Sequence, residues 1–149
     1  MATRGLAQGE LLLRERIAAI MGTSLELRAI GTDAALLDEA LDESVLELKR
    51  VEDLMTDWRP SPLETLNDKA GQGPQVVPKE LFDLIERACE IGRLTGGAFD
   101  VTYAGAGKLW DFKQEPPVIP TDAQLRAALA KVGWQRLVLD KQKLSIDLP

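Results

Sequence analysis

The sequence contains no histidine and only one cysteine among its 149 residues. The missing histidine excludes nucleophile and general-base schemes that use an imidazole, and it excludes histidine metal ligands. A single cysteine, Cys89, excludes an internal disulfide and cannot by itself build a zinc site. Cys89 lies at helical spacing from nearby apolar residues, so a structural thiol is the favoured interpretation. Any metal would need oxygen ligands, and no group of acidic residues has the spacing of a calcium-binding loop.

Long apolar runs and basic runs are missing as well. No stretch approaches the roughly 20 apolar residues of a transmembrane helix, so we expect no transmembrane segment. The apolar run near the N-terminus covers only residues 11–13 and is flanked by charged residues, which does not fit a signal peptide. The net charge is −6 at pH 7 with the charges interspersed, which argues against nucleic acid as a partner.

The apolar pattern predicts one domain of the α+β class, with a mainly antiparallel sheet packed against three helices. Residues 1–16 are interpreted as a polar N-terminal lead-in, and residues 17–149 as the folded part. Alternation of apolar and polar residues predicts a strand over 25–29, and the apolar residues within 137–148 predict a hairpin. The proline and glycine residues of the stretch 60–78 predict a loop.

Three segments have the apolar spacing of amphipathic helices. The first covers residues 33–55, with Thr32 or Asp33 as its cap. The second begins after Pro78, and the third begins at a capping box over residues 121–124. The residues expected to face the core are Leu37, Leu41, Val45, Leu48, Val51 and Met55 in the first helix, Leu81, Leu84, Ile85, Ala88 and Ile91 in the second, and Leu125, Ala128, Leu129 and Val132 in the third.

The aromatic residues concentrate in one nearly uncharged loop. Four of the seven, Phe99, Tyr103, Trp110 and Phe112, follow a glycine pair that ends the second helix. Such a loop is typical of a site for a planar or phosphate-bearing ligand, and a small hydrophobic cluster beneath the loop is the alternative. Residues 104–109 do not complete a Walker A loop or a dinucleotide-binding glycine motif, so neither phosphate-binding motif is present.

Residues 95–102, Thr-Gly-Gly-Ala-Phe-Asp-Val-Thr, followed shortly by Leu-Trp at 109–110, resemble the central motif of the ApbE family of flavin transferases. Other blocks agree in order and spacing, namely residues 21–23 (Met-Gly-Thr), 55–58 (Met-Thr-Asp-Trp), 66–67 (Leu-Asn), 76–81 (Val-Val-Pro-Lys-Glu-Leu) and 128–133 (Ala-Leu-x-x-Val-Gly). The resemblance covers nearly the whole chain and implies an incomplete ApbE-like, or T-fold-like, fold.

The resemblance implies the activity of a FAD:protein FMN transferase. In that reaction a threonine of a target flavoprotein attacks the FMN-side phosphate of FAD, and AMP leaves. FAD is then the substrate, and Mg²⁺ offsets the charge that develops on the phosphates. The family's downstream Asp-Leu-Gly-Gly-x-x-Lys-Gly block and metal ligands have no counterpart here. We therefore expect Mg²⁺ ligands outside this sequence and no transfer by the 149 residues alone. A non-catalytic flavin-binding module is the alternative.

The resemblance places Met21, Trp58, Ala98, Phe99 and Asp100 at the bound FAD. Met21 would lie against the flavin edge and Trp58 would stack on a ring, whereas the residues alone favour packing in the core for both. Asp100 would accept hydrogen bonds from the adenine or a ribose, and a cap on nearby backbone N–H groups is its alternative role. We assign no catalytic and no metal-ligating residue within the sequence.

The resemblance also bears on the cellular compartment. Family members are commonly periplasmic and often anchored to the inner membrane by a lipid on an N-terminal cysteine. The sequence shows no such cysteine and no signal peptide. The resemblance favours the periplasm, and the cytoplasm stays open.

Overall fold

The computed structural model describes residues 10–111, 115–116 and 118–149. Phe112 of the aromatic loop therefore lies outside the described residues. The chain divides into two compact units, Met1–Ser61 and Pro62–Pro149, which are described separately. No helix in the described part of the chain is both long enough and apolar enough to cross a membrane.

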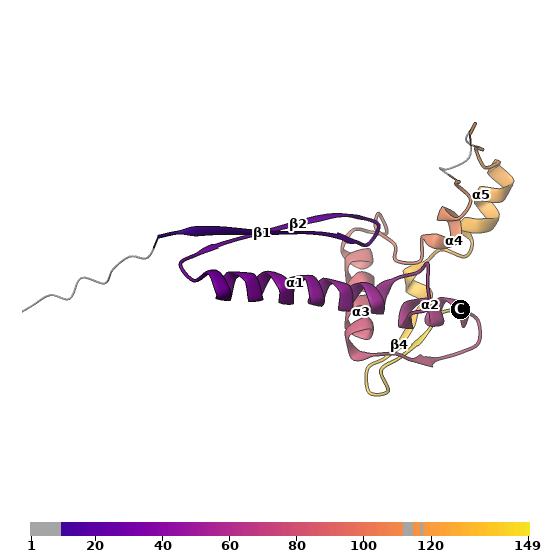
Figure 1. Ribbon diagram of the computed structural model, residues 1–149. Helices are drawn as coiled ribbons and strands as arrows, with labels where there is room; N and C mark the ends of the chain where they lie inside the picture. Colours follow the sequence, from indigo (N-terminus) through magenta and orange to yellow (C-terminus); the bar gives the residue numbers. More distant parts are fainter. Residues whose placement is uncertain (1–9, 112–114, 117) are drawn as a thin grey trace, which may run out of the picture. The chain divides into compact units, whose positions relative to one another are not determined.

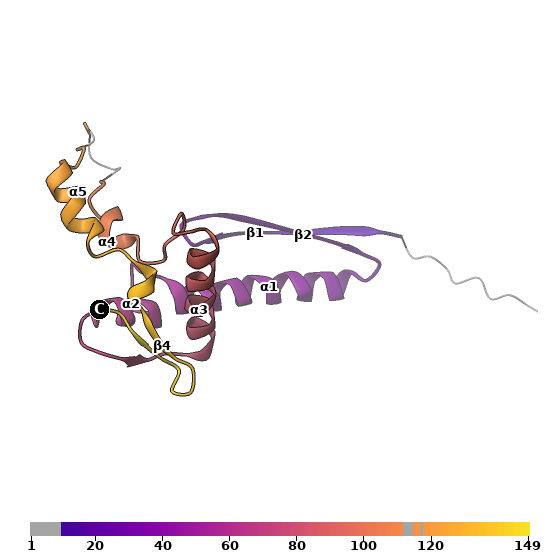
Figure 2. The same cartoon turned by 180° about the vertical axis from the view of Figure 1, so that it is seen from behind.

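The first unit is a long hairpin beside a long helix (Figures 1 and 2). β1 (Leu12–Ile20) and β2 (Thr23–Gly31) pair antiparallel along their full length. α1 (Ala34–Met55) contacts both strands and begins at Asp33, whose side chain accepts hydrogen bonds from two backbone N–H groups of the first turn. The predictions of the second strand, the long helix and an Asp33 cap are confirmed.

The interpretation of residues 12–16 as part of a polar lead-in is wrong, because they form the first half of β1. Their alternation was hidden because arginines occupy two inward positions. The Nε atom of Arg14 lies 3.5 Å from Oδ2 of Asp38 in α1, and the Nε atom of Arg16 lies 2.7 Å from Oδ1 of Asp42. The ion pairs neutralise the two arginines on the side of β1 that faces α1, whereas a pattern based on apolar residues assigns arginines to the solvent-facing side.

The second unit packs a small antiparallel sheet with helices. Its elements are α2 (Pro62–Asp68), β3 (Gln75–Val76), α3 (Lys79–Leu94), α4 (Ala104–Gly107), α5 (Asp122–Leu129), the 3₁₀ turn η1 (Trp134–Arg136), β4 (Val138–Asp140) and β5 (Ser145–Asp147). The strand order is β3-β5-β4. Leu81, Phe82 and Ile146 are fully buried at the centre of this unit.

The α+β class and the antiparallel sheets are confirmed, as are the capping box of α5 and the hairpin of β4 and β5. The loop predicted over 60–78 is wrong, because α2 and β3 lie within it. Pro62 is tolerated at the first position of a helix, and Leu66 is buried, so a short helix forms despite the prolines. Leu84 and Leu129 are more than half exposed, against prediction, and Phe82 is buried instead of Leu84.

Candidate functional site

Met21 lies in the two-residue turn between β1 and β2, where both central residues have positive φ. The φ of Met21 is 53° and that of Gly22 is 71°, the geometry of a type I′ hairpin turn. The backbone N–H of Met21 donates a hydrogen bond of 3.0 Å to the Oε1 atom of Glu52 in α1. The side chain of Met21 is 42% exposed, so it is not a core residue and is available to a ligand.

Trp58 follows the C-terminal end of α1 in the same unit. Thr56, two residues earlier, is buried and caps the helix, and its backbone N–H donates to the Glu52 carbonyl. Trp58 itself is 62% exposed. Arg59, the next residue, lies 2.6 Å from the Asp53 carboxylate. The Trp58 ring is therefore not packed in the core, which the sequence also allowed. Its exposed aromatic face is available to a planar ligand.

The loop of Ala98, Phe99 and Asp100 begins where α3 ends in a Schellman motif. Gly96 and Gly97 have positive φ, and their N–H groups donate to the carbonyls of Arg93 and Gly92. A hydroxyl then fixes the next residues, because Thr95 Oγ1 accepts the N–H of Phe99 at 3.1 Å. Ala98 and Phe99 are exposed.

Asp100 joins this loop to the segment before β4. Its Oδ1 atom accepts hydrogen bonds from the N–H of Thr102 at 2.8 Å and from the Thr102 hydroxyl at 2.7 Å. Its Oδ2 atom accepts the N–H of Trp134 at 3.0 Å. The Thr102 hydroxyl also accepts the N–H of Gly133 at 2.8 Å. The capping role considered for Asp100 is therefore present, and it reaches more than 30 residues along the chain.

These contacts also set the charge state of Asp100. Burial opposes ionisation of the carboxyl, but the hydrogen bonds from Thr102 and Trp134 outweigh it and hold the pKa of Asp100 below its ordinary value of 3.8. A carboxylate has about four acceptor positions, and three are occupied here. Asp100 can therefore cap the loop and still accept one further hydrogen bond.

Behind this loop, Trp134 packs on α3. A Cβ atom on Gly92 would lie 2.8 Å from Cδ1 of the Trp134 ring, so only glycine fits beneath it. Cys89, one turn earlier in α3, is half-buried, and burial followed by the negative charge of Asp100 raises the pKa of its thiol. A raised pKa agrees with the structural role expected for this thiol.

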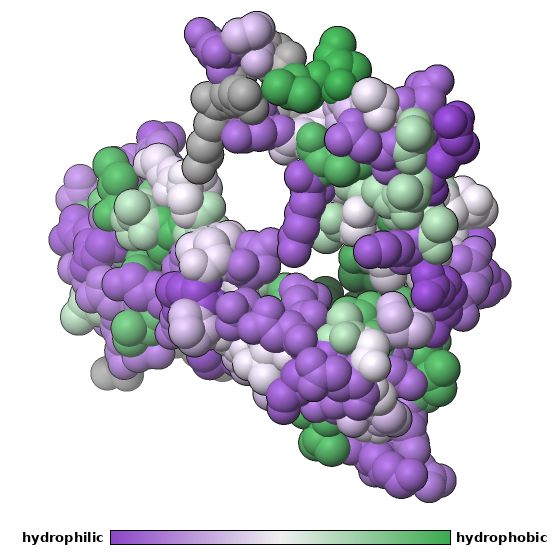
Figure 3. Space-filling model, turned by 90° about the vertical axis from the view of Figure 1, so that its right-hand side faces the viewer, coloured by the Kyte–Doolittle hydropathy of each residue, from purple (hydrophilic) through white to green (hydrophobic). Residues whose placement is uncertain are grey.

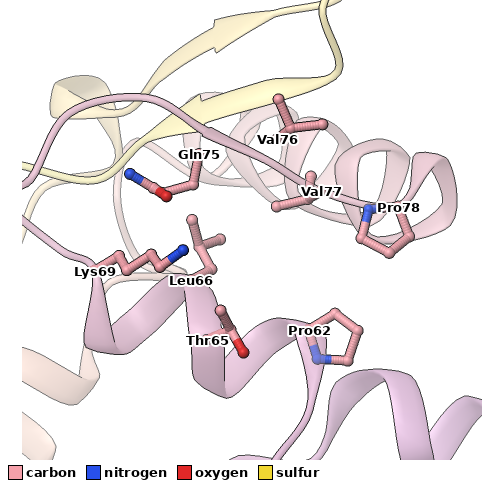
Figure 4. Close-up of a pocket in the computed structure, with 8 residues that line it drawn as sticks. All are labelled: Pro62, Thr65, Leu66, Lys69, Gln75, Val76, Val77 and Pro78. Carbon is pink, nitrogen blue, oxygen red and sulfur yellow. The ribbon is translucent and has the colours of Figure 1, made fainter.

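A separate pocket of about 190 Å³ lies in the second unit between α2 and β3 (Figure 4). It is lined by Pro62, Thr65, Leu66, Lys69, Gln75, Val76, Val77 and Pro78. None of the five residues predicted to contact FAD lines it. Exposed apolar residues instead form separate patches on a mainly hydrophilic face in Figure 3. In the described residues no group of three acidic or cysteine side chains is arranged to hold a metal ion.

Comparison with known proteins identifies the family of this chain. Residues 21–149 match the model of the ApbE family. The chain belongs to the ApbE family. This match confirms the resemblance carried by the Met-Gly-Thr and Thr-Gly-Gly-Ala-Phe-Asp blocks.

The curated relatives that match this chain share the name FAD:protein FMN transferase. The FAD:protein FMN transferase of Salmonella typhimurium is 34% identical over 136 residues, which cover 87% of this chain and 39% of that protein. The FAD:protein FMN transferase of Vibrio cholerae is 32% identical, covering 87% of this chain and 40% of that protein. The chain thus spans about two fifths of the length of these relatives.

Solved ApbE structures share the fold. The flavin transferase ApbE from Vibrio cholerae aligns with a TM-score of 0.77 at 26% identity, over 93% of this chain and 46% of that one. The ApbE protein from Thermotoga maritima aligns with a TM-score of 0.75 at 27% identity, over 92% and 45% of the two chains. The ApbE-like fold expected from the sequence is confirmed.

Sequence reasoning missed three residues that support the predicted site. Glu52 binds the Met21 turn, while Thr102 and Trp134 bind Asp100. Thr102 belongs to the quoted motif, and its position two residues after an aspartate is a signal for a local side-chain turn. No sequence signal identifies Glu52 or Trp134, because each contacts a residue more than 30 positions away.

Proposed function

We propose that these residues form the FAD-contacting part of a FAD:protein FMN transferase. The observation that carries the proposal is the match of most of this chain to curated relatives of that name. Because the chain spans about two fifths of those relatives, the activity is proposed for the intact gene product. A purely flavin-binding module is not favoured, since the curated relatives are named as transferases.

Within this proposal, Met21 and Trp58 contact the flavin ring. Both side chains are substantially exposed, and a thioether or an indole face suits a planar, polarisable ring. Ala98, Phe99 and Asp100 line the adenosine side. Gly96 and Gly97 end α3 without side chains, which allows a ligand to approach the backbone closely. The acceptor position left on Asp100 Oδ2 takes one hydrogen bond from the adenine or a ribose.

The proposed reaction is a displacement at phosphorus. The hydroxyl oxygen of an acceptor threonine forms a bond to the FMN-side phosphorus of FAD, and the bond from that phosphorus to the bridging oxygen breaks. AMP leaves with that oxygen, the hydroxyl proton is released, and FMN stays on the target as a phosphoester. Binding FAD in one orientation contributes to the rate by fixing the phosphorus for attack.

Mg²⁺ belongs to the proposal through the family resemblance. The described residues do not fit a magnesium site, since no acidic group of three is arranged for one. We therefore assign no step of the reaction to Mg²⁺ through the residues of this chain. A periplasmic location is part of the proposal on the same resemblance, and cell fractionation of the tagged gene product tests it.

Mass spectrometry tests the proposed function directly. The intact gene product is incubated with FAD, Mg²⁺ and a target domain that carries an acceptor threonine. We expect the target to gain the mass of FMN, and a target with valine at the acceptor position to stay unmodified. An unmodified threonine target, together with no FAD binding at high micromolar concentration, would refute the proposal.

A further inference from the structure

The turn at Met21 has a backbone conformation that its sequence does not favour. Type I′ turns prefer asparagine, aspartate or glycine at the first central position, and Met21 occupies it with a φ of 53°. A side chain with a Cβ atom is disfavoured there, because Cβ crowds the following carbonyl oxygen. Such an outlier persists only where surrounding contacts hold it, and it points to a functional role for the residue.

Glu52 supplies the contact that holds this turn from outside the hairpin. In a two-residue hairpin turn the N–H of the first central residue has no partner across the strands. Glu52 Oε1 accepts this N–H of Met21 at 3.0 Å. The Glu52 side chain is only 17% exposed. A hydrogen bond to a poorly solvated carboxylate is among the stronger ones in proteins.

The electrostatic environment at the C-terminal end of α1 disfavours the Glu52 carboxylate. Glu52 lies in the last turn of α1, where the partial negative charge of the helix end disfavours carboxylates and no basic residue is present. Arg59, after the helix, lies 2.6 Å from Asp53 and 3.9 Å from Glu52. The same helix end therefore contacts both the Met21 turn and the residue next to Trp58.

We propose that Glu52 is a positioning residue, which holds the turn so that the Met21 side chain is presented to the flavin ring. In this role Glu52 acts through the backbone N–H of Met21, which its Oε1 atom accepts at 3.0 Å. This inference deepens the proposed function and rests on it.

Three substitutions of Glu52 separate its hydrogen bond from its charge. E52L removes both, E52D keeps the charge on a side chain one methylene shorter, and E52Q keeps an acceptor without the charge. We expect E52L and E52D to weaken FAD and FMN equally, by about threefold to tenfold, which is the size of one net hydrogen bond. E52Q should lose less flavin affinity than E52D, because its amide oxygen still accepts the Met21 N–H, although more weakly than a carboxylate does. E43L, at an exposed glutamate of the same helix, is the matched control.

A double-mutant cycle shows whether Glu52 acts through Met21. Flavin affinity is measured by fluorescence titration of the intact gene product, and thermal unfolding shows that each variant is folded. In the M21A background, E52L should cause no further loss of flavin affinity, because the thioether that Glu52 places is already absent.

Each outcome has a distinct meaning. Absence of FAD binding by the unmodified protein refutes the proposed function, and the role of Glu52 with it. If the unmodified protein binds FAD and E52L and E52D bind it equally well, only the role of Glu52 is refuted. An additive loss in the double mutant, or a loss in E52Q as large as that in E52D, also overturns the inference.

Discussion

Replacing Gly92 with alanine tests whether the packing of Trp134 on α3 supports the loop that carries Asp100. Gly92 is buried in the last turn of α3, and a Cβ atom there would lie 2.8 to 3.0 Å from three atoms of the Trp134 ring. Contacts this short require the ring or the helix to move. The backbone N–H of the same tryptophan binds Asp100 Oδ2 at 3.0 Å, so the movement reaches the proposed FAD loop.

Two opposing effects decide the stability of Gly92→Ala. Alanine in place of glycine inside a helix contributes about 1 kcal/mol through lower chain entropy. Overpacking a close-packed site typically costs about 1 to 3 kcal/mol. Disturbing the hydrogen bond from Trp134 to a charged carboxylate adds to this cost. We expect a net destabilisation of about 1 to 2 kcal/mol.

Gly105→Ala is the matched control within the same unit. Gly105 lies in α4, and a Cβ atom there would meet the nearest atom, Val132 Cγ2, at 3.5 Å, an ordinary contact distance. The helix-propensity gain therefore has no packing cost against it, and the variant should be neutral or slightly more stable. The two glycine-to-alanine changes alter the unfolded chain equally, so their difference reports the folded state.

Urea unfolding followed by tryptophan fluorescence measures this difference. With a slope of about 1 to 3 kcal/mol per molar urea, the midpoint of Gly92→Ala should lie about 1 M below that of Gly105→Ala. FAD affinity should fall in Gly92→Ala only. A midpoint for Gly92→Ala equal to or above the control would show that Trp134 moves without cost, and the proposed support of the Asp100 loop would be wrong.

Three further predictions concern Asp100 and its neighbour Cys89. Asp100→Ala should weaken FAD more than FMN in fluorescence titrations, because the carboxylate is proposed to bind the adenosine side, and equal losses would assign it to loop structure alone. Because the pKa of Asp100 is lowered below its ordinary value of 3.8, ionised Asp100 stabilises the folded protein above that value. The stability advantage of the unmodified protein over Asp100→Asn should therefore be constant above about pH 5 and should shrink as the pH falls below about 4. An advantage that persists unchanged at pH 3 would contradict this. Cys89, with its raised pKa, should react with iodoacetamide at pH 8 more slowly than the same thiol in urea, as mass spectrometry can show.

The elements that the sequence predicted well are those whose signals are local. The long helix is capped by Asp33, and the capping box of α5 joins Thr121 and Gln124, three residues apart. In each case a short pattern contains both partners of the interaction. The Schellman end of α3 belongs to the same kind, because Gly96 and Gly97 bind carbonyls within one turn.

The elements that were missed depend on partners far along the chain. β1 was missed because Arg14 and Arg16 point toward α1, where Asp38 and Asp42 neutralise them. The pattern of apolar residues cannot distinguish an inward-facing arginine that has an acidic partner from a solvent-facing arginine that has none. Leu84 likewise has the helical spacing of a core residue, but it is more than half exposed, while Phe82 is fully buried.

The proposed site combines both kinds of information. Its motif residues could be found from the sequence because they are neighbours, and Met21-Gly22 and Ala98-Phe99-Asp100 are read directly as blocks. Beyond its local contacts, each block is held by a distant residue, Glu52 for the turn and Trp134 for the loop. Glu52 accepts a hydrogen bond from the backbone N–H of Met21, and the backbone N–H of Trp134 donates one to the Asp100 side chain. Because each contact involves one backbone group, no pairing of side-chain types marks it in the sequence. A motif therefore suggests which residues are proposed to meet the ligand, while the folded structure is needed to identify the residues that hold the motif in place.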